Sequence, residues 1–222
     1  MALDLPIPKK IYAHGFISIK EGKMSKSKGN VIYPENLTQK YGVDATKYFL
    51  LREFTFDQDI SFTPENFVNR YNADLANDLG NLLSRTIGMI NKYFGGKVDT
   101  SGLKISDIDK KLEESVLQNI KEVEKLMDSL HVSNALEKIW TIISDSNKYI
   151  DDTRPWELAK SENKEDKDTL ISVMAHLVEN LRKVAIMLQA YMPETAEKML
   201  EQLNIKDNDW DSIKWLLFGS FT

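Results

Sequence analysis

Four lysines crowd into the nine residues from Lys20 to Lys28, within the segment KEGKMSKSKGN. Ammonium groups on a mobile loop can stabilise negative charge that develops in a transition state. Gly22 and Gly29 supply the flexibility that such a loop needs to approach a ligand and to move. The segment is too polar and too basic to be packed, so we expect it to be exposed and mobile. A solvated basic loop without a catalytic role is the simpler alternative.

The segments that flank this loop, up to residue 62, are predicted to form short elements, and the rest of the chain is predicted to form long helices. Residues 10–20 are rich in β-branched and aromatic side chains, which favours a strand or hairpin arm. Residues 34–62 contain two short helical pieces, the first ending at Gly42 and the second opened by Asp44 as a cap. The sequence therefore predicts a compact linking element after the loop.

From Thr63 onward the pattern is almost wholly helical. Thr63-Pro64-Glu65 combines a capping residue, a proline at the first helical position and a carboxylate in the first turn. Apolar spacing continues to Gly95-Gly96, which predicts one helix of about thirty residues. Further helices are predicted over 112–127, 131–150 and 169–191, with Pro193 opening a shorter one. The helix over 169–191 is apolar round much of its circumference, so we assign its Met and Leu stripe to the core.

Composition limits the class of protein. With 222 residues, 42% hydrophobic and 28% charged, the chain is typical of a globular protein in the cytoplasm, and no apolar run could span a membrane. No cysteine is present and the three histidines show no metal spacing, so we predict no metal site. The segment from Thr63 carries 20 basic against 27 acidic residues, so contacts with nucleic acid must be local.

The pentapeptide Lys23-Met24-Ser25-Lys26-Ser27 matches the KMSKS signature of class I aminoacyl-tRNA synthetases without a mismatch. The resemblance implies that Lys23 and Lys26 are catalytic residues that stabilise the pyrophosphate leaving ATP, and that Ser25 and Ser27 contact ATP with them. The second signature of these enzymes, His-x-Gly-His, and the strand–helix alternation of a nucleotide-binding fold are absent. We therefore expect a fragment of a longer enzyme, inactive alone and without bound ATP. ATP with magnesium, and methionine, would serve only the full-length enzyme.

Two longer runs indicate which synthetase the chain resembles. FVNRYNADLANDLGNLLSRT, from Phe67, and NKYIDDTRPWELAK, ending at Lys160, resemble methionyl-tRNA synthetases in sequence and in order. The resemblance implies a tRNA(Met) anticodon stem-loop as partner, with its CAU anticodon read by Asn81, Arg85 and Trp156. The four-residue spacing places the first two side chains on one helix face. An amide, a guanidinium and an aromatic face together suit an unstacked base.

Simpler explanations exist for each of these residues. Asn81 could be an exposed helix residue, Arg85 a partner of some carboxylate, and Trp156 a core aromatic behind a helix-starting proline. Weaker candidates for contacts with the tRNA backbone are Asn77, Asp78 and Arg154.

The predicted fold is mainly α: the helical-bundle anticodon-binding domain of class I synthetases, preceded by a small strand–loop–helix element. We divide the chain into a remnant of the catalytic fold (1–33), a linking, stem-contact element (34–62) and an anticodon-binding domain (63–222). The predicted function is recognition of tRNA(Met) as part of a methionine–tRNA ligase. Alternatives are a non-catalytic helical module that binds tRNA or protein, and a fragment of another class I synthetase of the leucine, isoleucine, valine or cysteine type.

Overall fold

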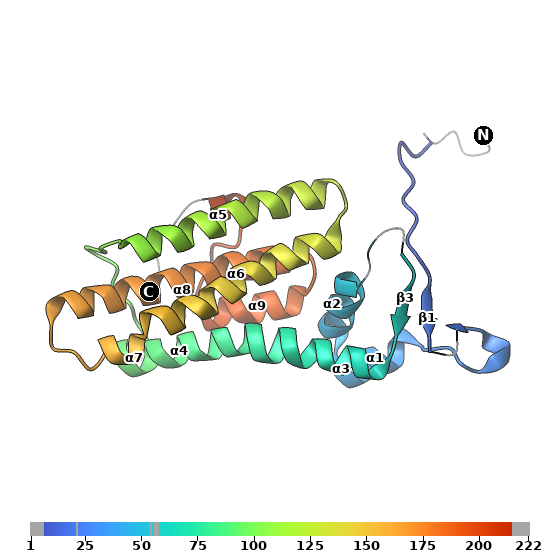
Figure 1. Cartoon of the computed structure of the whole chain (residues 1–222), viewed down its shortest axis with the longest axis horizontal. Coiled ribbons are helices and arrows are strands. Elements are labelled where there is room, and N and C mark those ends of the chain that lie inside the picture. The colour runs from blue at the N-terminus through green and yellow to red at the C-terminus, as the bar shows by residue number, and fades with distance from the viewer. Residues whose placement is uncertain (1–6, 21, 54, 56–57, 215–222) are drawn as a thin grey trace.

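A bundle of long helices forms most of the molecule, and a small sheet with two short helices lies beside one end of it (Figure 1). The computed structural model describes residues 7–20, 22–53, 55 and 58–214. The mainly α fold class predicted from the sequence is confirmed.

The sheet has three very short strands in the order β2-β1-β3. Strand β1 (Ile17–Ile19) pairs antiparallel with β2 (Gly22–Lys23) and parallel with β3 (Ile60–Phe62). The arm predicted over 10–20 therefore forms a strand only in its last part. Strand β3 was not predicted, because three residues are too few to show an alternating pattern.

The linking element contains α1 (Pro34–Tyr41) and α2 (Val43–Glu53), separated by Gly42 as predicted. Gly42 has a φ of +86°, a conformation that glycine adopts without strain. The predicted cap at Asp44 is wrong, because α2 already begins at Val43. The Asp44 carboxylate instead accepts a hydrogen bond of 2.7 Å from the backbone N–H of Thr195, in the first turn of another helix, α9 (Pro193–Gln202).

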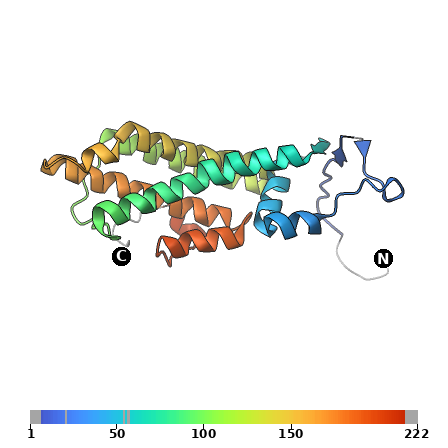
Figure 2. The same ribbon diagram turned by 90° about the horizontal axis from the view of Figure 1, so that it is seen from below.

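The predicted thirty-residue helix is continuous but not α-helical throughout. It consists of α3 (Pro64–Arg70), a π-helical segment η2 (Tyr71–Gly80) and α4 (Asn81–Phe94), and it runs along the length of the bundle (Figure 2). The Thr63 side chain caps its start by accepting from the N–H of Asn66, at 3.1 Å. Gly95 ends it in the left-handed conformation. The π-helical turns were not predicted.

The remaining helices follow the predicted order. Their bounds are α5 (Asp107–Asp128), α6 (Val132–Thr153), α7 (Pro155–Leu158), α8 (Lys164–Leu188) and a 3-10 helix, η3 (Trp210–Lys214). Helix α8 is buried on nearly all sides from residue 172 to 188, which confirms that its Met and Leu stripe belongs to the core. The tail packs back on the bundle as far as Ile213, which is fully buried, whereas residues 215–222 lie outside the described part of the chain.

Two hydrophobic cores hold these elements. The larger one lies within the bundle and extends to α2, whose Tyr48 ring packs 4.7 Å from that of Trp140, centroid to centroid. The smaller one joins the sheet to the linking element through Phe49, Phe62 and Phe67. Because burial of apolar surface is the main stabilising term, the linking element is anchored to both the sheet and the bundle. No helix in the described ranges has the length and apolarity that a lipid bilayer requires.

Candidate functional site

The lysine loop is a hairpin that folds back on itself. Lys23 ends β2, and Lys26 begins a short 3-10 helix (Lys26–Lys28) that Gly29 closes in the left-handed conformation. The backbone N–H of Ser25 donates to the Asn30 side chain at 2.8 Å, and the Ser25 and Ser27 hydroxyls are 2.8 Å apart. These contacts hold the pentapeptide in one folded segment, and its lysine side chains are exposed.

The electrostatics of this loop suit a polyphosphate. Lys23 Nζ lies 4.9 Å above the ring of Phe16, a cation–π contact that leaves the ammonium group open to a further partner. Across the described ranges, no ion pair engages Lys23, Lys26 or Lys28. All three side chains are exposed, as predicted for this loop. Their positive charge therefore remains available for phosphate oxygens.

Asn81 and Arg85 lie one turn apart at the start of α4, as the sequence indicated. Asn81 is exposed. The guanidinium of Arg85 forms an ion pair with Asp151 at the end of α6, with Nη2 and Oδ1 3.1 Å apart. Because the two side chains are 31% and 66% exposed, this pair contributes at most about 1 kcal/mol, so Arg85 can exchange Asp151 for another partner at little cost.

Trp156 lies on the surface and is not a core aromatic. Its exposed fraction is 37%, whereas that of Trp140 in the bundle is 7%. Arg154 positions it: with a φ of +46° this residue ends α6 in the left-handed conformation and turns the chain into α7. Its carbonyl oxygen then accepts the N–H of Glu157 at 2.8 Å. The turn places Trp156 where part of its side chain stays exposed, at the end of the bundle.

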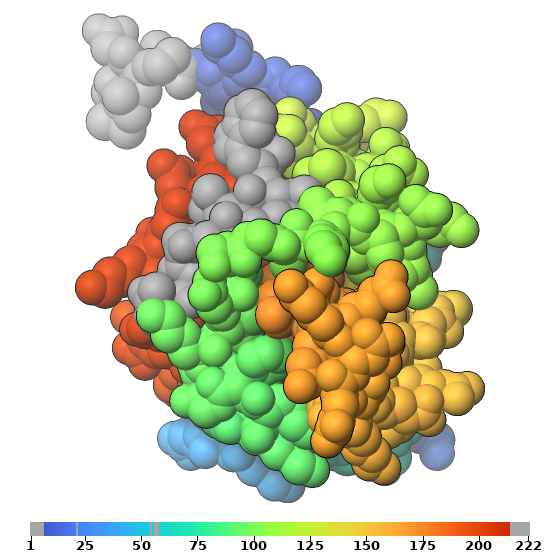
Figure 3. All heavy atoms as spheres, turned by 90° about the vertical axis from the view of Figure 1, so that its left-hand side faces the viewer, coloured from blue at the N-terminus to red at the C-terminus, as the bar shows by residue number. Residues whose placement is uncertain are grey.

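The Arg85–Asp151 pair brings α4 against the last turn of α6, which leads directly into α7. The end of α4 and the segment that follows α6 lie side by side at this end of the molecule (Figure 3). The lysine loop lies at the far end of the long axis (Figure 1). The structure thus places the residues predicted for catalysis and those predicted for anticodon recognition in two separate groups.

Sequence reasoning missed two polar residues of α6 that contact the long helix, Asn147 and Asp151. Asn147 and Asp151 lie one turn apart on α6, and Asn147 donates to the backbone carbonyl of Asp78 at 3.3 Å. Burial, and then the charge of Asp74, raise the pKa of Asp78 above its usual value. The i, i+4 spacing of Asn147 and Asp151 on an amphipathic helix was the signal in the sequence that could have identified them. Asn77, the neighbouring weaker candidate, is exposed.

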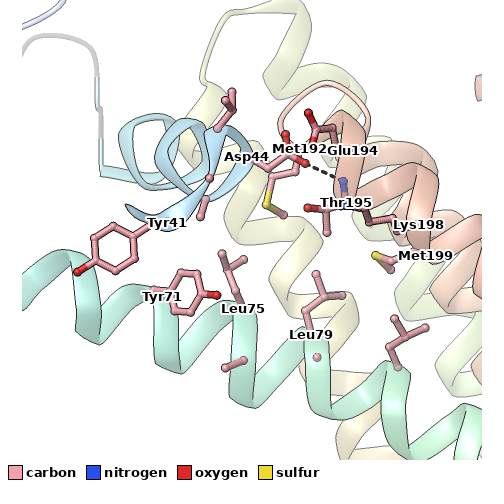
Figure 4. A pocket seen from close by; sticks show the side chains of 16 residues that line it. Tyr41, Asp44, Tyr71, Leu75, Leu79, Met192, Glu194, Thr195, Lys198 and Met199 are labelled. Atoms are coloured by element: carbon pink, nitrogen blue, oxygen red, sulfur yellow. Dashed lines mark hydrogen bonds between the residues drawn. The ribbon is translucent and has the colours of Figure 1, made fainter. Parts of the chain in front are cut away.

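A cavity of about 330 Å³ lies between the α1–α2 turn, η2 and α9 (Figure 4). Apolar side chains such as Leu75, Leu79 and Met199 line it, and the Asp44–Thr195 hydrogen bond crosses its upper edge. None of the predicted site residues lines this cavity. In the described parts of the chain, no cluster of three or more His, Cys, Asp or Glu residues could hold a metal ion.

Family models, curated relatives and solved structures all relate this chain to methionyl-tRNA ligases. Residues 1–87 match the family model of tRNA synthetases class I (M), and residues 100–217 match that of the anticodon binding domain of methionyl tRNA ligase. The methionine–tRNA ligase of Oceanobacillus iheyensis is 50% identical over 100% of this chain and 32% of its own length. That of Lactococcus lactis is 53% identical over 100% of this chain and 33% of its own.

Solved structures show the same relationship. Mycobacterium tuberculosis methionyl-tRNA synthetase in complex with methionyl-adenylate matches with a TM-score of 0.90 and 37% identity, covering 98% of this chain and 43% of that one. The chain thus spans about a third of the length of the curated relatives that it matches. These matches favour the main prediction over another class I synthetase and over an unrelated adaptor. The chain belongs to the methionyl-tRNA ligase family and contains the anticodon-binding domain of that family.

Proposed function

We propose that this chain reads the CAU anticodon of tRNA(Met) for an enzyme that joins methionine to that tRNA at the expense of ATP. The observation that carries the proposal is the exposed amide–guanidinium pair on α4, linked through Asp151 to the helix end that presents Trp156. These three groups offer hydrogen bonds to base edges and one face for stacking.

The anticodon site is suited to single-stranded RNA rather than to a duplex. An unstacked base can stack on the indole of Trp156, while its neighbours meet the amide of Asn81 and the fork of Arg85. Binding would replace the exposed Arg85–Asp151 pair, which loses little because the pair is weak. The acidic balance of the helical domain, 20 basic against 27 acidic residues, argues against tight binding to arbitrary RNA. Selectivity must then come from these local contacts.

The lysine loop would serve the chemical step in the full-length enzyme. Lys23 and Lys26 are free to contact the phosphates of ATP, whose bound magnesium would share the charge of the leaving pyrophosphate. Ser25 and Ser27 keep the loop narrow enough for close approach. Methionine and the rest of the nucleotide site would be provided by the portion of the relatives that this chain does not span.

Binding of fluorescent RNA hairpins to the 222-residue chain tests the anticodon assignment. A CAU hairpin should bind more tightly than hairpins with one anticodon base changed. Asn81→Ala should remove about 1–3 kcal/mol of that preference, because a base edge loses its paired donor and acceptor. Arg85→Lys retains the charge without the fork, so it should reduce discrimination while retaining much of the affinity. Ser84→Ala, an exposed change on the same helix, is the matched control. Equal affinity of the unaltered chain for all anticodons would refute the proposal.

A further inference from the structure

One buried carboxylate, that of Asp109 in the first turn of α5, joins three helices of the bundle. It accepts hydrogen bonds from the hydroxyl of Tyr149 on α6, at 2.5 Å, and from that of Ser172 on α8, at 2.8 Å. A third donor is the backbone N–H of Ser106, at 2.8 Å, in the capping box that starts α5. Asp109 is 1% exposed and Tyr149 is 3% exposed, so the contact between them is shielded from water.

The proton of this contact belongs to the tyrosine at neutral pH. Burial, followed by the hydrogen bond to Asp109, raises the pKa of Tyr149 far above its usual value, so the hydroxyl remains a donor. Burial also raises the pKa of Asp109, but the hydrogen bonds that this carboxylate accepts outweigh burial and leave its pKa lowered. The bond therefore runs from a neutral phenol to a carboxylate, which makes it stronger than a bond between two neutral groups.

Tyr149 lies one turn before Thr153, the residue with which α6 ends. Its carbonyl oxygen accepts the hydroxyl of Thr153 at 2.6 Å. The turn that follows Tyr149 carries Asp151, the carboxylate that pairs with the guanidinium on α4. Directly after this turn, Arg154 leads the chain in the left-handed conformation into α7 and Trp156. The last turn of α6 thus connects the buried tyrosine to two residues of the anticodon site.

Helix α7 depends on its neighbours for its position. It has only four residues, too few for a helix that is stable by itself, and it contacts α8. The start of α5, the end of α6 and the start of α8 lie together with α7 at one end of the bundle (Figure 1). Asp109 ties both flanking helices to α5, since it binds α6 through Tyr149 and α8 through Ser172.

We propose that the hydrogen bond between Asp109 and Tyr149 positions the anticodon site, with both residues acting as positioning residues that do not touch the RNA. The inference rests on the proposed function, because it concerns the placement of Asp151 and Trp156. Without this bond the last turn of α6 frays, and the RNA must order that turn when it binds. The cost of ordering is subtracted from the affinity. The loss falls on the CAU loop, because only that loop uses the ordered contacts in full.

The same substitution at opposite ends of the bundle tests this role in the full 222-residue chain. Tyr149→Phe removes the hydroxyl that Asp109 accepts, and Tyr48→Phe removes a hydroxyl that donates to Asp74 at the same distance of 2.5 Å. Tyr48 is 1% exposed and lies in α2, so each variant loses one buried bond to a carboxylate. Tyr149→Phe should weaken binding of a CAU hairpin about two- to tenfold and leave hairpins with other anticodons nearly unchanged. Tyr48→Phe should leave the affinity for every hairpin unchanged.

Hydrogen-exchange mass spectrometry without RNA gives a second readout. In Tyr149→Phe the amides of residues 150–156 should exchange faster than in the unaltered chain, while the first half of α6 exchanges at its former rate. Tyr48→Phe should leave the exchange of residues 150–156 unchanged. Faster exchange along the whole of α6 would show a general loss of stability and would overturn the positioning role.

The binding results separate the two proposals. If Trp156→Ala removes the CAU preference while Tyr149→Phe binds the CAU hairpin as tightly as the unaltered chain, the positioning role is overturned and the anticodon site stands. If Tyr149→Phe and Tyr48→Phe weaken the hairpin equally, the effect is one of overall stability and the positioning role is again overturned. If the unaltered chain shows no preference for CAU, the proposed function fails and this inference fails with it.

Discussion

Replacing Trp156 with alanine is the sharpest test of the anticodon site, because the structure separates its effects on binding and on folding. Trp156 is 37% exposed and lies on α7, a helix of only four residues. Removing a fully buried tryptophan costs about 3–5 kcal/mol of the free energy of unfolding. The loss here should be well below that range, so the variant should remain folded at room temperature.

The expected loss of binding follows from base stacking. Stacking of one base on an aromatic side chain contributes about 1–3 kcal/mol, which corresponds to roughly five- to 150-fold in the dissociation constant. The loss should fall on the CAU hairpin and leave the weaker binding of hairpins with other anticodons nearly unchanged. Trp156→Phe retains a smaller aromatic face and should restore part of the affinity.

Fluorescence anisotropy of labelled hairpins gives the dissociation constants, and thermal unfolding followed by circular dichroism gives the change in stability. Trp140→Phe serves as a control, because Trp140 is 7% exposed within the bundle and should affect stability without affecting selectivity. The reasoning is refuted if Trp156→Ala lowers the melting temperature severely while the folded fraction still prefers CAU. Such a result would make Trp156 a structural residue.

Three further predictions follow from other parts of the chain. The 222-residue chain should show no methionine-dependent ATP–pyrophosphate exchange, because one lysine loop cannot orient both substrates; exchange above background by purified chain would contradict this. Amides of residues 22–30 should exchange with solvent within seconds to minutes in hydrogen-exchange mass spectrometry, since the loop is exposed and has few backbone hydrogen bonds; slow exchange would show that the loop is held rigidly. Burial raises the pKa of Asp109, but hydrogen bonds from Tyr149, Ser106 and Ser172 outweigh it and hold this pKa below its usual value. The stability that the Asp109 carboxylate contributes is complete above the unfolded pKa of about 3.9 and is lost as pH falls through the lower folded pKa. Asp109→Asn should therefore destabilise the bundle by about 1–3 kcal/mol at pH 7, and the difference between the two proteins in urea unfolding should shrink steadily as the pH is lowered below that unfolded pKa.

The helices were largely predictable because their signals are local. Thr63 and Pro64 indicate where the long helix begins, and Gly95 indicates where it ends. Apolar residues at helical spacing identify the other helices of the bundle. The exposed lysine loop and the surface positions of Asn81 and Arg85 also follow from local pattern and helical spacing. What each residue binds is a separate matter, and for the anticodon residues it stays a prediction.

The features that were not predicted depend on contacts between distant segments. Strand β3 exists because β1 supplies its hydrogen bonds, and three residues carry no pattern of their own. Asp44 resembles a helix cap in sequence, yet its partner is Thr195. Within the π turns of η2, Leu79 is buried in the bundle core and the Asp74 carboxylate accepts from the hydroxyl of Tyr48 at 2.5 Å, so residues of this segment meet partners far away in sequence. Local propensity cannot specify any of these choices.

The hydrogen bond from Thr195 to Asp44 joins residues 151 positions apart and thereby constrains the order of folding. Helices α5 and α6 are adjacent in sequence and pack along each other, so they can assemble early. The linking element can pack on α6 through Tyr48 and Trp140 once α6 has formed, whereas its hydrogen bond to α9 forms later, because loop closure over so long a segment is costly. During synthesis the contact between the linking element and α9 therefore forms only after most of this chain has emerged. Loss of the Asp44–Thr195 hydrogen bond would consequently loosen the linking element from α9 while leaving its packing on α6 in place.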